Sequence, residues 1–142
     1  MLYFAYGMNT NNKKMGTTAV RLGPAVLPNY AWEMLLFANV YEQYNVRSLG
    51  ILWQIDEEIL ALLDQREKFP MFYNRLIADV LHNSQTKQAW VYTMTADNRT
   101  RLLGTRPRKA YLDAVTEGYA TDSLNINFLN YKPPAHCKNM DL

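Results

Sequence analysis

The order of strand-like and helix-like segments constrains the fold of this sequence more than any other feature. Only two segments, 56–67 and 107–119, have a helical pattern. A doubly wound parallel sheet would need a helix between successive strands, so the pattern argues against one. We therefore predict an α+β fold: a small, mostly antiparallel or mixed β-barrel flanked by helices. Strand patterns occur at residues 2–6, 25–40, 46–55, 72–82 and 87–95, and the second of these bends at Pro28 and Asn29 and holds one or two strands.

Length and composition predict a single domain over residues 1–142. Hydrophobic residues make up 49% of the chain and charged residues 20%, which is enough apolar side chain for a packed core. The single cysteine, Cys137, and the lack of a signal-peptide pattern or a bilayer-length apolar run predict a cytoplasmic protein with no membrane partner. Loops are expected at 7–24, with at most one helical turn, at 42–45 and at 97–106, and the tail, 130–142, is expected to be irregular.

The first strand ends abruptly within "YFAYGMN", residues 3–9. A hairpin would need a second apolar run at once, and none follows. Gly7 permits a close approach of the backbone to a ligand, and backbone N–H groups in such a turn can hold an anion or a carbonyl oxygen. The turn at Gly7, Met8 and Asn9 is therefore a candidate binding site.

The helical pattern at 56–67 places a carboxylate in line with its apolar stripe. Asp56 is expected to cap the helix, and Ile59, Leu62 and Leu63 have the spacing of one buried face. Glu67 follows Leu63 by four residues, so a continuing helix would bury it. Burial would raise the pKa of Glu67 towards 7, where a carboxyl group can take and return a proton. The alternative is that the helix ends earlier and Glu67 points into solvent or pairs with Arg66, Lys68 or Arg75.

Two motifs resemble those of the γ-glutamylcyclotransferase-like family, also called AIG2-like. The segment "YFAYGMN" is similar to the family's "YFAYGSN". The second segment, "LLDQREKFPMFYNR" at 62–75, resembles a family signature of a leucine-aspartate pair, Glu-Gly and Tyr-x-Arg, and it matches at Asp64, Glu67, Pro70, Tyr73 and Arg75. The middle strands, "LGPAVLPNYAW" and "SLGILWQI", and the last helix, "PRKAYLDAVTEGY", also resemble the family, so the similarity covers most of residues 2–120.

The resemblance implies an enzyme that cyclises a small-molecule γ-glutamyl substrate to 5-oxoproline and releases the amine. Glu67 would be the catalytic general acid and base, because one carboxylate can take a proton from the substrate's α-amine and return it to the leaving amine. The turn at Gly7, Met8 and Asn9 would bind a substrate oxygen. The other substrate-binding residues are expected to be Tyr6, Tyr73 and Tyr111, of which Tyr111 matches a family tyrosine that faces the pocket. The chemistry requires no metal or organic cofactor.

Two departures from the family pattern leave a second function open. Met8 stands where the family usually has Ser, and Lys68 stands where it usually has Gly, beside Glu67. A pairing between Lys68 and Glu67 would lower the pKa of the carboxyl group and weaken it as a base. The alternative function is a catalytically impaired binding module for a small anionic ligand, a nucleotide or nucleic acid.

A basic segment, "RTRLLGTRPRK" at 99–109, would supply the surface of such a module. Most basic runs are solvated loops, and a net charge of +2 is too small to indicate nucleic acid. Arg75 is expected to pair with Asp64. His82, His136 and Cys137 lack the spacing of zinc ligands, so no metal site is predicted. The basic residues of the segment are Arg99, Arg101, Arg106, Arg108 and Lys109.

Overall fold

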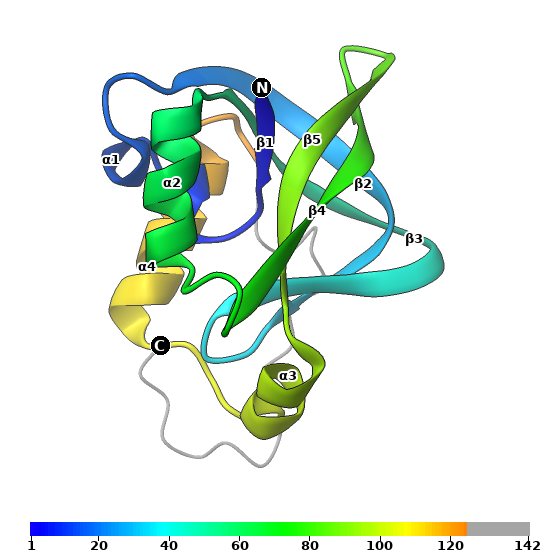
Figure 1. The fold of residues 1–142 in the computed structure, drawn as a ribbon, viewed down its shortest axis with the longest axis vertical. Helices are drawn as coiled ribbons and strands as arrows, with labels where there is room; N and C mark the ends of the chain where they lie inside the picture. Colours follow the sequence, from blue (N-terminus) through cyan, green and yellow to red (C-terminus); the bar gives the residue numbers. More distant parts are fainter. Residues whose placement is uncertain (125–142) are drawn as a thin grey trace.

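Five strands form a closed barrel in the computed structural model, which describes residues 1–124 (Figure 1). Their order around the barrel is β1-β3-β2-β4-β5. The first strand pairs in parallel with the last, and every other neighbouring pair is antiparallel. Helices flank this mixed barrel, which confirms the predicted α+β fold. The strands are β1 (Leu2–Ala5), β2 (Val20–Met34), β3 (Ala38–Gln54), β4 (Tyr73–His82) and β5 (Gln85–Met94).

The long β2–β3 ladder differs from the predicted pattern at both ends. β2 begins at Val20, where a loop was expected, because Gly23 (φ 108°) lies at a register shift that the strand absorbs. At the predicted bend, Asn29 (φ 63°) lies at a second register shift, but β2 continues through it as one strand, and the chain reverses between Met34 and Ala38. Residues 42–45 were expected to form a loop, but β3 continues through them.

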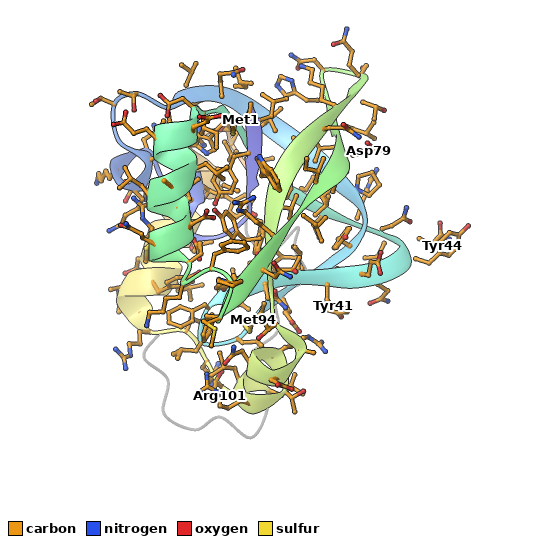
Figure 2. The ribbon with its side chains drawn as sticks, viewed as in Figure 1. Met1, Tyr41, Tyr44, Asp79, Met94 and Arg101 are labelled. Atoms are coloured by element: carbon orange, nitrogen blue, oxygen red, sulfur yellow. The ribbon has the colours of Figure 1, made fainter. Side chains whose placement is uncertain are left out.

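The bend of β3 lies in that segment. Pro28 pairs with Arg47 and Tyr30 with Glu42, so residues 43–46 have no partner on β2 other than the single residue Asn29. Tyr44 projects from this bend and is 86% exposed (Figure 2). The polar sequence therefore marks an insertion within a strand and not the strand's end.

Two hydrophobic clusters share the barrel wall because successive residues of β1 face opposite sides. Phe4 belongs to a cluster with residues from all five strands, which fills the barrel, and Val115 and Tyr119 pack onto it. Tyr3 and Ala5 belong to a second cluster on the outer face. α2 (Glu57–Arg66) covers that outer face with Ile59 and Leu63. The predicted stripe is thus correct at these two positions, whereas Leu62 is 56% exposed.

The helices around the N-terminal turn confirm some predicted boundaries and correct others. Asp56 caps α2, since its Oδ1 accepts the Ile59 N–H at 2.8 Å. The segment 7–24 contains a short 3-10 helix, η1 (Met8–Thr10), and α1 (Asn12–Met15). A loop was expected at 97–106, but α3 (Ala96–Leu102) occupies most of it, with Asp97 in its first turn and arginines in its last, as the helix dipole favours.

α4 (Lys109–Ala120) begins and ends differently from the predicted helix at 107–119. Pro107 precedes the N-cap Arg108, so it is not the first helical residue. Gly118 lies inside the helix and does not end it. A Cβ atom at Gly118 would lie 2.1 Å from Thr10 Oγ1, so this glycine lets α4 pack directly on η1. The contact fixes α4 beside the N-terminal turn.

The irregular tail predicted at 130–142 lies outside the described residues. Within residues 1–124, none of the helices has the length and apolar character needed to cross a membrane.

Candidate functional site

Every residue assigned to the site from sequence lines one cavity of about 230 Å³. The cavity lies where the end of β1, the C-terminal end of α2, the β2–β3 turn and α4 meet; α2 runs towards α4 in Figure 1. The residues expected there are Tyr6, Gly7, Met8, Asn9, Glu67, Tyr73 and Tyr111. Side chains that the sequence did not assign complete the lining, namely Tyr3, Phe37, Ala38, Arg66, Lys68, Phe72 and Tyr92.

Glu67 lies at the C-cap of α2, one residue beyond the helix. Its backbone N–H donates to Leu63 O at 2.8 Å, which continues the helical hydrogen-bond pattern and turns the side chain into the cavity. Burial raises the pKa of Glu67 to about 7, against the opposing effects of the Arg66 charge and of a hydrogen bond from Asn9. In the described part of the chain, Glu67 forms no ion pair with Arg66, Lys68 or Arg75.

Asn9 holds the Glu67 carboxylate by a direct hydrogen bond. The Asn9 Nδ2 group donates to Glu67 Oε1 at 3.1 Å and to the Tyr3 hydroxyl at 2.9 Å, so both of its hydrogens are used. Its Oδ1 accepts a hydrogen bond from Arg66 Nη1 at 2.7 Å. The Asn9 side chain is therefore fixed by protein partners, and it orients Glu67 within the site.

Gly7 brings the turn into contact with β3 and α4. A Cβ atom at Gly7 would lie 3.1 Å from both the Ala38 Cβ and the Tyr111 hydroxyl, which is closer than ordinary packing. The Tyr111 hydroxyl accepts the Ala38 N–H at 3.0 Å.

The tyrosine hydroxyls of the cavity differ in what they can offer a ligand. Tyr6 donates its proton to Tyr92 O, and Tyr73 donates to Ala38 O, each at 2.6 Å. Tyr111 accepts the Ala38 N–H, and no acceptor within residues 1–124 takes its proton. Burial raises the pKa of Tyr111, so this hydroxyl stays protonated at neutral pH. Tyr111 and Tyr3 thus keep a hydroxyl proton that a ligand could accept, whereas Tyr6 and Tyr73 donate theirs to the backbone and form the cavity wall.

Comparison with known proteins identifies the family. The family model described as "Gamma-glutamyl cyclotransferase, AIG2-like" matches residues 3–112. The chain belongs to this family. No curated protein matches the chain in a sequence search.

Solved structures share the fold of this family member at low sequence identity. One named "Gamma-glutamyl cyclotransferase" is 16% identical with a TM-score of 0.76, over 99% of this chain and 92% of that one. YkqA from Bacillus subtilis is 21% identical with a TM-score of 0.72, over 92% of this chain and 51% of its own. An AIG2-like protein from Mus musculus is 20% identical with a TM-score of 0.57, over 72% of this chain and 81% of that one.

The second motif of this family member contains a structural ion pair. Arg75 Nε lies 2.8 Å from Asp64 Oδ1, which confirms the predicted pairing. The Tyr92 hydroxyl donates to the same oxygen at 2.6 Å. Burial raises the pKa of Asp64, but the hydrogen bonds from Arg75 and Tyr92 and the charge of Arg75 outweigh it, so the net shift is downwards. Asp64 therefore stays ionised and anchors the end of α2 to β4 and β5.

The basic segment of this family member does not form one cationic surface. Arg99 pairs with Glu33 at 2.7 Å and Lys109 with Asp113 at 2.7 Å. Arg101 donates to Asn98, and Arg106 is buried. His82 is also buried, with its Nε2 3.0 Å from Leu22 O. Within residues 1–124, no group of three or more His, Cys, Asp or Glu is arranged to hold a metal ion; His136 and Cys137 lie outside that range.

Sequence reasoning missed Arg66, Tyr3 and Phe37 as members of the site. Arg66 is adjacent to the motif's Glu67, and only its contact with Asn9 distinguishes it from a solvent-exposed arginine. Tyr3 could have been assigned to the site from the alternation of side chains along β1. It belongs to the outer cluster, on the face of the barrel that α2 covers. Phe37 comes from the β2–β3 turn, which lies within the segment 25–40 that was expected to be strand.

Proposed function

We propose that this chain is a γ-glutamylcyclotransferase-type enzyme that converts a γ-glutamyl amine or amino acid to 5-oxoproline and releases the amine. The observation that carries the proposal is the half-buried Glu67 carboxylate, which lines a tyrosine-rich cavity beside the N-terminal turn and has a pKa raised to about 7. A group with that pKa is present in both protonation states at neutral pH, as a proton shuttle requires. The single cysteine supports a cytoplasmic location as part of the same proposal.

In this reaction one carboxylate serves two nitrogens in turn. Glu67 takes a proton from the substrate's α-amine, and the nitrogen then attacks the γ-carbonyl carbon to form the ring. The bond from that carbon to the leaving amine breaks, and Glu67 returns the proton to the departing nitrogen. Atoms balance without a co-reactant, so no cofactor is needed. General acid–base assistance of this kind contributes about 10²–10⁴-fold, and holding the two ends together adds a proximity contribution.

The Tyr111 hydroxyl is a suitable donor for a substrate oxygen in the described cavity. It accepts the Ala38 N–H and keeps its own proton for a ligand. We assign it to a substrate oxygen, either the α-carboxylate or the carbonyl oxygen that gains charge during ring closure. Gly7 and Met8 would contact the γ-glutamyl group through their backbone, and Tyr6 and Tyr73 would contact it through their rings.

The test is a direct assay. The purified protein is incubated with γ-glutamyl amino acids, γ-glutamylamines and glutathione, and 5-oxoproline is measured. The proposal expects product from the wild type and a loss of about 10²–10⁴-fold in Glu67→Gln, which keeps the shape and removes the proton carrier. Glu58→Gln is the matched control, because Glu58 is an exposed acid in the first turn of the same helix.

If the wild type forms no 5-oxoproline from any substrate of the panel, the proposal is contradicted. Binding of nucleotides or nucleic acid by that inactive protein would favour the alternative, a binding module. Equal activity in Glu67→Gln and Glu58→Gln would remove Glu67 from the reaction while leaving the family assignment intact.

A further inference from the structure

Arg66 is an exposed residue whose guanidinium group reaches back into the site. It lies in the last turn of α2, where a basic side chain suits the helix dipole. Its Nη1 donates to Asn9 Oδ1 at 2.7 Å across 57 residues of sequence, and Arg66 lines the cavity. An arginine that only complemented the dipole would have no reason to make this specific contact.

The contact decides which way the Asn9 amide points. An amide can in principle lie in two orientations related by a flip, with oxygen and nitrogen exchanged. In the flipped orientation the Asn9 NH₂ group would face the guanidinium, which has only donors, and the oxygen would face Glu67 Oε1, which accepts. With Arg66 in place, the NH₂ group faces Glu67 and Tyr3.

We propose that Arg66 is a positioning residue: it locks the Asn9 amide in the orientation that donates to Glu67 Oε1. The other carboxylate oxygen is then directed at the substrate. The inference rests on the proposed function for its catalytic consequence, whereas its structural content, the fixed orientation of Asn9, stands on the hydrogen bonds alone.

The charged and titratable groups around Glu67 come from several elements. Arg66 on α2 is the cation whose charge lowers the pKa of Glu67 against the effect of burial. Lys68 lines the cavity next to it in sequence. The ionisable hydroxyls that interact with the Glu67 charge are those of Tyr3 and Tyr6 on β1 and its end, Tyr73 on β4 and Tyr111 on α4. Removal of Arg66 therefore removes both a cation and the lock on Asn9.

The experiment compares Arg66→Met, Arg66→Lys and the wild type in protein labelled for NMR. Arg101→Met is the matched control, because Arg101 is an exposed arginine on α3 outside the cavity lining (Figure 2). Three quantities are measured: solvent exchange of the two Asn9 side-chain NH₂ hydrogens, the ¹³C titration midpoint of the Glu67 carboxyl, and kcat and KM for a γ-glutamyl amino acid. Thermal melts establish that each variant is folded.

Arg66→Met is expected to speed exchange of the Asn9 hydrogens by at least about tenfold, since a lost hydrogen bond of about 1.4 kcal/mol corresponds to that factor. The Glu67 midpoint rises by about one pH unit. The value of kcat at pH 7 falls by about tenfold with KM nearly unchanged, because the lock affects proton transfer and not binding. Arg66→Lys restores the midpoint more than the exchange rate, and Arg101→Met matches the wild type.

Unchanged Asn9 exchange and an unchanged Glu67 midpoint in folded Arg66→Met would overturn the inference, whatever the activity. Changed NMR signals in a protein with no turnover would leave the positioning role standing and reject the proposed reaction. If Arg66→Met does not fold, Arg66→Lys decides: faster exchange of the Asn9 hydrogens than in the wild type would support the inference, and equal exchange would overturn it.

Discussion

Asp64 and Glu67 lie three residues apart at the same end of α2, and their surroundings are opposite. Asp64 accepts hydrogen bonds from Arg75 Nε at 2.8 Å and from the Tyr92 hydroxyl at 2.6 Å, and its pKa is lowered. Glu67 accepts one from the Asn9 amide at 3.1 Å, and its pKa is raised to about 7. Burial acts upwards on both pKa values. At Glu67 it is the largest effect, whereas at Asp64 the hydrogen bonds from Arg75 and Tyr92 and the charge of Arg75 outweigh it.

The difference shows how one short motif can provide both an anchor and a proton carrier. A carboxylate that shares its charge with an arginine is held ionised and cannot take a proton near neutral pH. A carboxylate held by a neutral amide keeps its orientation without that stabilisation of charge. Pairs of acids whose environments separate their pKa values are a common arrangement for acid–base chemistry.

The largest expected effect comes from replacing each acid by its amide. Glu67→Gln should lower kcat by about 10²–10⁴-fold and keep the fold, since it removes the proton carrier. Asp64→Asn should lower the free energy of unfolding by about 2 kcal/mol, through weaker hydrogen bonds to Arg75, with kcat changed less than about tenfold. Steady-state kinetics and urea unfolding measure the two quantities. A greater loss of turnover in folded Asp64→Asn would reverse the two roles.

The next largest expected effect is the contribution of Glu67 to the pH dependence of the free energy of unfolding. The unfolded chain releases this proton near 4.5 and the folded chain near 7, so the unfolded state gains stability between those values as pH rises. The wild type should lose about 3 kcal/mol relative to Glu67→Gln between pH 4.5 and 7.5. Urea unfolding of both proteins at intervals of one pH unit measures it. A difference that stays constant with pH would mean that the folded pKa is not raised.

The sequence predicted this site largely because its motif is local. Ile59 and Leu63 placed Glu67 on the buried face, and Asp64 and Arg75 were expected to pair; both patterns involve residues close in sequence. The roles assigned to these residues stay predictions, and the residues themselves all line one cavity.

The parts that the sequence did not predict depend on distant contacts. Arg66 acquires its place through Asn9, and Tyr111 acquires its direction through the N–H group of Ala38. Gly118 has the pattern of a helix end, yet it serves a contact with Thr10. The α3 helix is too short and polar for its periodicity to stand out. In each case the packing partner, which the local sequence does not contain, determines the structure.

Arg75→Met should destabilise the fold moderately, because it removes the arginine that holds Asp64 ionised. It removes the ion pair with Asp64 and the stacking of the guanidinium carbon, 4.5 Å from the Phe69 ring centre and 4.4 Å from that of Trp90. The free energy of unfolding should fall by about 2 kcal/mol, since both partners are partly exposed and the full cost of a buried unpaired charge does not apply. The pKa of Asp64 should rise. Urea unfolding and ¹³C titration measure the two effects; unchanged stability would show that Tyr92 alone suffices.

Lys68→Gly is expected to have the smallest effect on stability, and it tests whether a charge beside Glu67 affects the pKa of Glu67. Lys68 has a φ of 52°, a left-handed conformation in which glycine has no steric cost, so the substitution should stabilise the fold by about 1 kcal/mol. The pKa of Glu67 is set by burial, Arg66 and Asn9, so its titration midpoint should not move. Lys68→Ala is the control, because it removes the same charge and keeps the strained backbone. A midpoint that rises equally in both variants would mean that the Lys68 charge acts on Glu67, and a stability gain equal in both would assign the effect to charge and not to the backbone.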